Sequence, residues 1–188
     1  MELLIIGLGE NMDINFYLAQ ITSLLAWIFL IFSYWKNKDD KILYLQVISC
    51  VFFVLNYVFL KAYTGLFVVF FEIIRDYLYI KFDDDKKTFL LSLPIYALIG
   101  IFSYDGVWSL FSIFASLNDG YALIYKGKKV VFLGIVTYVL WIIYDIHYFS
   151  LPNVLAEGIL IMSNIIILLL KKEKKRYVSR SGRKRKHA

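Results

Sequence analysis

The chain has 188 residues, of which 60% are hydrophobic, 19% aromatic and 19% charged, and its formal net charge is +6. Soluble domains are about 45–50% apolar even when Gly is counted, so a compact soluble protein is excluded. Intrinsic disorder is excluded as well, because low hydrophobicity is its signature. The single cysteine, Cys50, excludes an intrachain disulfide and a cysteine-built metal site. A polytopic membrane protein remains.

Apolar segments of nearly membrane-spanning length recur along the chain, and a spanning helix needs about 20 mainly apolar residues. Residues 66–71 do not alternate in polarity, which favours helices over barrel strands. Residues 1–14 are predicted to form a short external segment. The sequence predicts seven transmembrane helices at 15–35, 42–60, 63–81, 88–103, 107–125, 130–148 and 151–170.

Basic residues indicate the orientation. All of the 21 Lys and Arg residues except Lys61 and Arg75 fall in four segments that seven crossings place on one face: 36–41, 81–87, 126–129 and 171–186. Cytoplasmic loops carry an excess of Lys and Arg, so we expect an external N-terminus and a cytoplasmic C-terminus. We expect the tail, 171–188, to be unstructured and attracted to anionic lipid head groups rather than to nucleic acid.

The spacing of the segments predicts an internal duplication. A shift of 88 residues places Lys38 on Lys126 and Asp76 on Asn164, and it aligns the hydropathy of 15–81 with that of 107–170. The segment 88–103 then links two three-helix units of the same orientation, a 3+1+3 parallel repeat. The alternative is a chance match, since identity between the units is low.

Several short motifs carry a resemblance to a known family. They are Leu-Gln-Val-Ile-Ser at 45–49, Ala-Tyr-Thr-Gly at 62–65, the intramembrane Arg75, and Trp-Ile-Ile-Tyr-Asp at 141–145. In these motifs the chain resembles the YgjV family of bacterial inner-membrane proteins, over most of its length after residue 15. The resemblance implies a multi-pass protein of the bacterial inner (cytoplasmic) membrane, and it implies a fold more than a function.

The three-helix repeat is similar in architecture to the SWEET and PQ-loop superfamily of small-solute carriers. Members of that superfamily line the substrate path with an Asn from the third helix of each repeat, and Asn164 has that position here. The chain departs from these carriers because it has no Pro-Gln pair. Its two prolines, Pro94 and Pro152, also lie outside the helices in which SWEET-type carriers have hinges.

Three ionisable residues interrupt the third span: Glu72, Arg75 and Asp76. Inserting a charged side chain at the middle of the membrane costs about 2.5–3.5 kcal/mol on insertion scales. Their spacing of i, i+3 and i+4 puts them on one helical face, which we expect to point into the bundle. Arg75 can pair with either of the other two.

Polar residues of the fifth and seventh spans lie at the level of Arg75, namely Asn118, Asp119 and Asn164. In one interpretation Arg75 is neutralised by Glu72, Asp76 or Asp119, and the two Asn residues are interhelical hydrogen-bond partners. In the other, these residues line a solute cavity. Trp27, near the middle of the first span, either stacks on a ring of the solute or packs against neighbouring helices. The predicted binding residues are Trp27, Glu72, Arg75, Asp76, Asn118, Asp119 and Asn164.

A second polar group is predicted nearer the outer face: Gln20, Asn56, Asp145, His147 and Glu157. Asp145 and His147 lie close to a helix end, so this group is interpreted as wet interfacial residues, with a vestibule as the alternative. A metal or proton site at His147 is a weak signal, because one histidine without cysteines is a poor ligand set.

The sequence favours a membrane carrier for a small polar solute, such as a sugar or a nucleoside-like compound, that alternates access around the level of Arg75. No cofactor, metal or nucleic acid is expected, and a homo-oligomer is compatible with the sequence. No catalytic motif accompanies the paired carboxylates, so we expect no enzyme. The alternative function is a non-transporting interaction or assembly protein whose charge network is structural.

Overall fold

The computed structural model describes residues 13–34, 39–81, 85–125 and 127–184, and this part of the chain folds into helices joined by short connections. The predicted external segment 1–14 lies almost wholly outside the described residues, as do the side chains of the basic tail. Within the described residues there is no strand, so the all-helical prediction is confirmed. The helices are α2 (Ile14–Tyr34), α3 (Asp39–Phe59), α4 (Tyr63–Lys81), α5 (Asp85–Phe102), α6 (Ser109–Leu123), α7 (Lys128–His147) and α8 (Leu151–Lys184).

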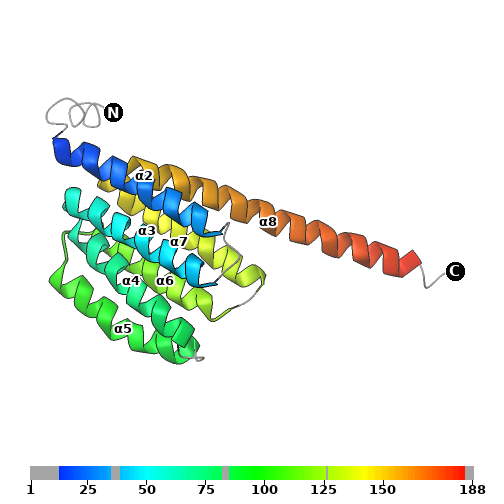
Figure 1. Cartoon of the computed structure of the whole chain (residues 1–188). Coiled ribbons are helices and arrows are strands. Elements are labelled where there is room, and N and C mark those ends of the chain that lie inside the picture. The colour runs from blue at the N-terminus through cyan, green and yellow to red at the C-terminus, as the bar shows by residue number, and fades with distance from the viewer. Residues whose placement is uncertain (1–12, 35–38, 82–84, 126, 185–188) are drawn as a thin grey trace.

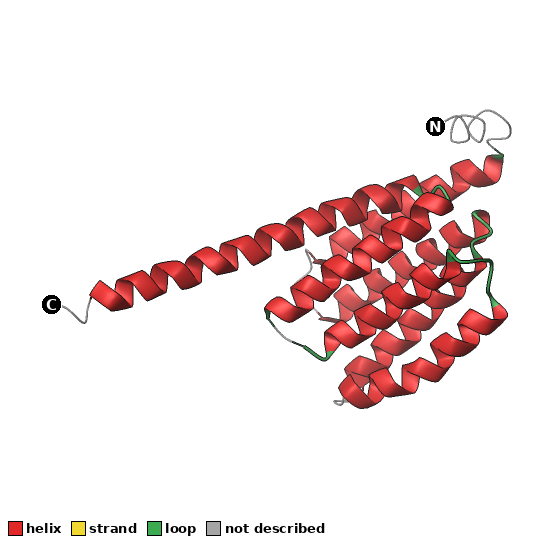
Figure 2. Ribbon diagram, turned by 180° about the vertical axis from the view of Figure 1, so that it is seen from behind, coloured by secondary structure: helices red, strands yellow, loops and turns green. Residues whose placement is uncertain are grey.

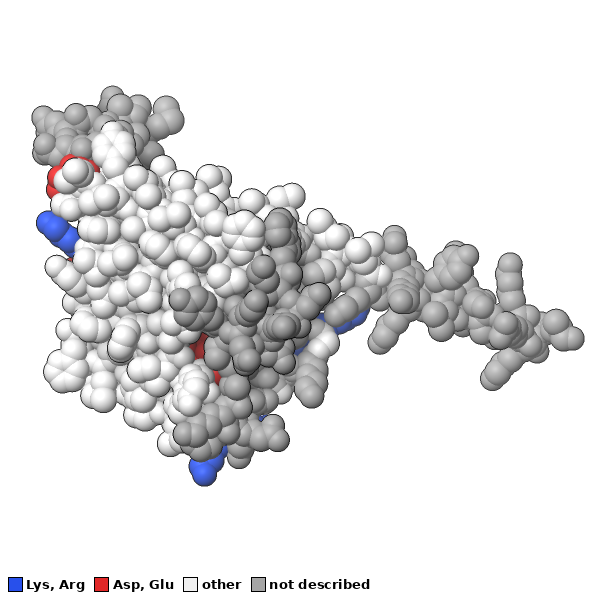
Figure 3. Space-filling model, viewed as in Figure 1, with Lys and Arg blue, Asp and Glu red and all other residues white. Residues whose placement is uncertain are grey.

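Three of these helices are long and apolar enough on their own to cross a membrane: Ile14–Phe32 of α2, Lys128–His147 of α7 and Leu151–Leu170 of α8. The other helices are shorter or less apolar. For example, α4 carries Glu72, Arg75 and Asp76 within 19 residues. Much of the described surface is nevertheless uncharged (Figure 3), and large apolar side chains such as Phe70 and Leu155 point outward. Such a surface suits lipid rather than water.

The helices form a bundle (Figure 1), and the contacts between them run around a ring. Helix α3 packs between α2 and α4, and α7 packs between α6 and α8. The two groups meet where α4 contacts α6 and where α2 contacts α8, while α5 lies outside the ring against α4 and α6. A helix bundle with short connections of this kind buries the facing sides of its helices.

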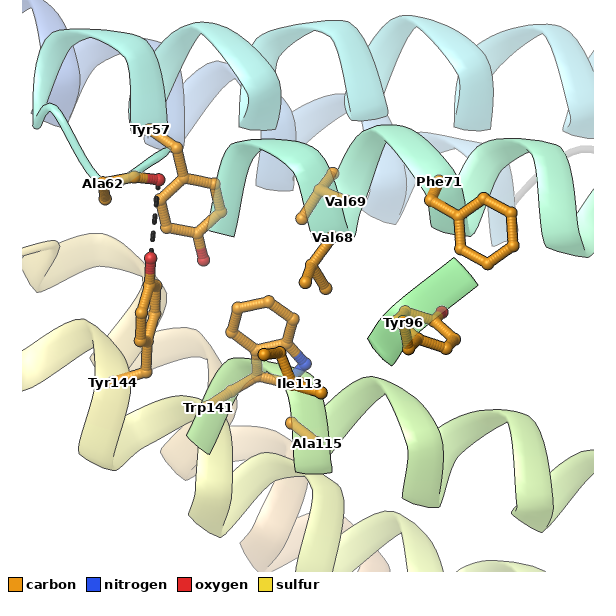
Figure 4. Close-up of a cluster of buried hydrophobic side chains, with 10 residues drawn as sticks. All are labelled: Tyr57, Ala62, Val68, Val69, Phe71, Tyr96, Ile113, Ala115, Trp141 and Tyr144. Carbon is orange, nitrogen blue, oxygen red and sulfur yellow. Dashed lines mark hydrogen bonds between the residues drawn. The ribbon is translucent and has the colours of Figure 1, made fainter. Parts of the chain in front are cut away.

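The core lies where α3, α4, α5, α6 and α7 converge. Its side chains point toward one another from these helices (Figure 4), among them Tyr57, Val68, Tyr96, Trp141 and Tyr144. Tyr144 is fully buried, and its hydroxyl donates to the carbonyl of Ala62 at 3.4 Å. Aromatic rings supply much of the contact, since Phe71 and Tyr96 meet edge to face with centroids 5.0 Å apart.

Helices α3 and α7 end in the same kind of turn. Lys61 and Phe149 both adopt left-handed backbone conformations, with φ of 55° and 56°. In each turn the next amide donates to the carbonyl five residues earlier, at 2.9 Å: Ala62 to Tyr57, and Ser150 to Asp145. This is the Schellman pattern, which satisfies carbonyls at a helix end and reverses the chain tightly.

Helix α8 continues well past the predicted span and projects beyond the bundle (Figures 1 and 2). The expectation of an unstructured tail from residue 171 onward is therefore wrong as far as Lys184. Lys, Glu and Arg are good helix formers, and no Gly or Pro interrupts the segment before Gly182. A helix begun by the apolar part of α8 can therefore propagate into the charged part.

Gly65 lets α4 approach α7 closely. Its amide donates to the Tyr144 hydroxyl at 2.7 Å, and a Cβ at this position would lie 2.8 Å from that oxygen. We expect Gly65→Ala to displace the buried tyrosine and to destabilise the protein by about 1–3 kcal/mol. The matched control is Gly158→Ala, in α8, where a Cβ meets nothing within 4 Å and helix propensity favours Ala. Thermal unfolding in detergent should move in opposite directions for the two variants, and a shift in the same direction would contradict this account.

Candidate functional site

Arg75 lies at the centre of a polar cluster between α4, α5 and α6, and its side chain is only 1% exposed. Its Nη2 atom lies 2.8 Å from an oxygen of Asp76 and 2.7 Å from an oxygen of Asp119. Its Nη1 atom donates to the Tyr96 hydroxyl at 3.1 Å and to the Ser116 carbonyl at 2.9 Å. A buried guanidinium with this many partners is held in one orientation.

The two carboxylates on Arg75 are less buried than it is. The side chain of Asp76 is 56% exposed and that of Asp119 is 41% exposed. Asp76, one of the three charged residues of α4, nevertheless directs its carboxylate at the buried Arg75 guanidinium. Glu72, the third of them, accepts a hydrogen bond from the Ser116 hydroxyl and is not ion-paired with Arg75. The sequence allowed Arg75 three carboxylate partners, and the packing of α6 against α4 selected two.

Asn118 and Asn164 lie apart from this cluster. The Asn118 amide donates to the Leu133 carbonyl at 2.8 Å and to the Thr137 hydroxyl at 2.9 Å, which ties α6 to α7. Asn164 lies against Gly134, where an added Cβ would be 3.2 Å from its amide nitrogen. Both residues therefore lie at helix–helix contacts, where polar side chains commonly hold transmembrane helices together.

A second buried cluster centres on Asn153, near the start of α8. Its side-chain oxygen accepts from the Ser23 hydroxyl at 2.6 Å and from the Trp27 indole at 2.9 Å. Its amide lies 3.4 Å from the Asn56 side-chain oxygen. These bonds join α8 to α2 and α3. Asn153 was not among the predicted residues, although its spacing of four from Glu157 places both on one face of α8 and could have drawn attention to it.

The interpretation of the outer polar group as wet interfacial residues is wrong for Asn56, which is fully buried, and for the two acids of the group. Asp145 is fully buried and Glu157 is 6% exposed. One oxygen of Asp145 accepts from the Tyr57 hydroxyl at 3.1 Å. The other oxygen, and Oε2 of Glu157, have no hydrogen-bond partner within the described part of the chain. His147 is exposed and stacks on Trp108, and no group of three metal-ligating side chains occurs among the described residues.

A cavity of about 240 Å³ lies between the two clusters. Of the predicted binding residues, Trp27, Glu72 and Asp119 line it, whereas Arg75, Asp76, Asn118 and Asn164 do not. Further lining residues come from α3, α7 and α8. The polar ones are Ser49, Cys50, Thr137, Asn153 and Glu157, and the aromatic ones are Phe53, Tyr57, Tyr138 and Trp141.

The cavity shares several features with small-molecule sites. Such sites are concave and mainly apolar, with a few polar groups that orient the ligand. Here aromatic rings make the walls, since Trp27 meets Phe53 edge to face with centroids 5.5 Å apart and Tyr57 stacks on Trp141 at 6.1 Å. Glu72, Asp119 and Glu157 supply carboxylates to the cavity, and Ser49 and Thr137 supply hydroxyls. The cavity can thus bind one small polar molecule that also presents an apolar or ring surface.

Comparison with known proteins places the chain in a family. The family model Imp-YgjV, described as bacterial inner membrane protein, matches residues 17–174. The chain belongs to this family. The protein is therefore a bacterial inner membrane protein embedded in the lipid bilayer, as the short motifs indicated. Searches among curated proteins and among solved structures found no match.

Proposed function

We propose that this Imp-YgjV family protein is a carrier, not an enzyme, for a small polar solute such as a sugar or a nucleoside-like compound. The observation that supports the proposal best is the cavity between the two helix groups, lined from both by polar and aromatic side chains. A carrier needs a site at the junction of two units that can move against each other. The junction here consists of the α4–α6 and α2–α8 contacts.

The arrangement supports a 3+1+3 parallel repeat, with α2–α4 and α6–α8 as the units and α5 as the linker. Under the shift of 88 residues, Lys61 corresponds to Phe149, so the two left-handed turns fall on equivalent positions. The α4–α6 contact likewise corresponds to the α8–α2 contact.

Side-chain contacts between the units follow the same symmetry. Gly65 contacts Tyr144 through a hydrogen bond of 2.7 Å, and the equivalent pair, Asn153 and Asn56, lies 3.4 Å apart. If the two units matched in hydropathy by chance alone, equivalent contacts between them would not be expected. The repeated contacts therefore support the duplication.

The cavity itself is built from equivalent positions. Four pairs of lining residues are related by the same shift: Ser49 and Thr137, Cys50 and Tyr138, Phe53 and Trp141, and Val69 and Glu157. A site on the axis that relates two parallel units can open to either side by opposite tilting of the units. The last pair differs in chemistry, because an acid replaces an apolar residue, so the solute meets two unlike walls.

The proposal includes seven membrane crossings, with the N-terminus outside and the C-terminus in the cytoplasm. The four basic segments support this orientation, because two crossings separate each segment from the next and bring all four to one face, which the excess of Lys and Arg marks as cytoplasmic. The tail would then lie beside anionic head groups of the inner leaflet. A homo-oligomer is compatible with the proposal.

Uptake into proteoliposomes tests the proposal, and Cys50 makes the test specific to the cavity. Cys50 is the only cysteine in the chain and it lines the cavity. We expect saturable uptake of at least one member of a panel of sugars, nucleosides and other small polar solutes. A bulky thiol reagent should abolish this uptake, because the modified side chain would fill the site. Repeating the assay with a pH gradient shows whether protons are coupled to transport.

The matched control is Cys50→Ala, which should transport the same solute and be insensitive to the reagent. Uptake that the reagent inhibits equally in Cys50→Ala would place the transport elsewhere. Failure to move any member of the panel would contradict the carrier proposal.

The alternative is a non-transporting interaction or assembly protein, and one observation favours it. Arg75 has a complete set of protein partners, and Asn118 and Asn164 lie at helix–helix contacts. A structural network of this kind needs no solute. Under this alternative no solute of the panel is taken up into proteoliposomes. Modification of Cys50 then leaves binding of the protein's interaction partner intact.

A further inference from the structure

The charges around the cavity are unbalanced. Glu72, Asp119 and Glu157 line it, and none of its lining residues is basic. Among the residues whose burial the structure describes, the buried basic side chains comprise Arg75 alone. Its guanidinium is already shared between Asp76 and Asp119. The carboxylate of Glu157 therefore has no cation of the described chain beside it.

Glu157 is the group most in need of a partner. The residue is 6% exposed, and its Oε2 atom makes no hydrogen bond within the described residues. Asp145 lies near enough to interact with it electrostatically and has an unpartnered oxygen of its own. Burying an unpaired carboxylate is costly, and the cost is greatest in a membrane interior. A positively charged ligand in the cavity would supply the partner that Glu157 lacks.

The remaining walls suit the same kind of ligand. The rings of Trp27, Phe53, Tyr57 and Trp141 line the cavity beside the acids. Aromatic faces attract cations, and aromatic cages are a common means of binding organic ammonium groups. A metal ion is disfavoured by this apolar surface. The volume of about 240 Å³ exceeds the roughly 150 Å³ that accommodates benzene in an engineered cavity, so one ring with a short substituent fits.

We infer that the solute is a small organic cation that carries a ring, with its positive group beside Glu157 and its ring between the aromatic walls. This inference rests on the proposed carrier function and narrows its substrate class. It also assigns a role to Glu157, the acid that occupies the position of Val69 in the first unit.

Protection of Cys50 measures the binding of such a ligand directly. The full chain, purified in detergent, is treated with a small neutral thiol reagent in the presence of either benzylammonium or benzyl alcohol, which have similar size and differ in charge. We expect benzylammonium to protect Cys50 at a concentration at least about tenfold lower than benzyl alcohol, a difference of about 1.4 kcal/mol. Glu157→Gln should reduce this ratio to near one. Asp105→Asn, an exposed carboxylate in the α5–α6 connection, should leave it unchanged.

Equal protection by the two compounds, or protection by neither, would overturn the inference. So would a preference for benzylammonium that survives Glu157→Gln. The comparison in the unmodified protein needs no variant, so a folding defect in Glu157→Gln leaves that arm decisive. Uptake of a neutral solute without preference for the cation would refute this inference and keep the carrier. Binding of the cation through Glu157 without uptake of any solute would refute the carrier and keep the cation site.

Discussion

Replacing both carboxylates on Arg75 by amides, in Asp76→Asn/Asp119→Asn, is expected to lower the free energy of unfolding by about 3–5 kcal/mol. The reason is an asymmetry of burial. Arg75 is 1% exposed, whereas the side chains of Asp76 and Asp119 are 56% and 41% exposed. Removing the acids therefore leaves an unpaired charge that has almost no exposed surface of its own. Unfolding in detergent and the yield of monodisperse protein both measure the effect.

A third substitution makes this prediction specific to the buried charge. Adding Arg75→Met to the double variant removes the unpaired cation while keeping an apolar side chain of similar length, so stability should be partly restored. The exposed carboxylate of Asp105 provides the matched control, and Asp105→Asn should change stability by less than about 0.5 kcal/mol. A double variant as stable as the unmodified protein would show that Arg75 does not depend on these ion pairs.

The single variant Asp119→Asn separates a structural role from a transport role, because Asp119 touches both Arg75 and the cavity. Asp76 still pairs with Arg75 in this variant, so the fold should survive. Normal protein levels with lost uptake would assign Asp119 to the solute site. Loss of the protein itself would assign it to the structural network.

The second large effect is expected for Asn153→Leu, which removes the side-chain hydrogen bonds of Asn153 to the helices of the first unit. Its side-chain oxygen accepts from Ser23 at 2.6 Å and from Trp27 at 2.9 Å. A buried donor left without an acceptor costs about 1–3 kcal/mol, and Ser23 is fully buried. We expect the free energy of unfolding to fall by about that amount for each of the two donors. Uptake should be lost as well, because Asn153 lines the cavity.

Ser163→Ala is the matched control for Asn153→Leu on the same helix. Ser163 is exposed and donates only to the Ile159 carbonyl of its own turn, at 2.9 Å, so its removal should be nearly neutral. Thermal unfolding of the two variants should therefore differ clearly. Similar stability for both would show that the Asn153 bonds contribute little to holding the units together.

The helices themselves could be predicted from the sequence. The predicted segment 63–81 coincides with α4 (Tyr63–Lys81), and 130–148 differs from α7 (Lys128–His147) by two residues at most at each end. Apolar runs, charged interruptions and connection lengths are local properties, and they determine where a helix begins and ends. The length of α8 was underestimated, because a change from apolar to charged residues was interpreted as the end of the helix.

The burial of single residues is harder to predict from the sequence than the positions of the helices. Asp145 was expected to be wet because it lies near the end of a helix in the sequence. The structure buries it completely, beside Tyr57 of α3. Burial depends on which helices cover a residue, and the covering helices are distant along the chain. For the same reason Asn153 was missed, since its partners Ser23 and Trp27 lie in α2.

Composition and the order of residues along the chain were enough to show that this is a helical membrane protein with charged residues inside the span of α4. Both follow from the cost of placing polar groups in an apolar medium. Only the tertiary structure decided that Arg75 pairs with Asp76 and Asp119, that Asn118 and Asn164 lie at helix contacts, and that Glu157 borders a cavity. Side chains within one helix meet at fixed spacings. Side chains of different helices meet only where packing brings the helices together, and the linear order of residues does not specify that packing.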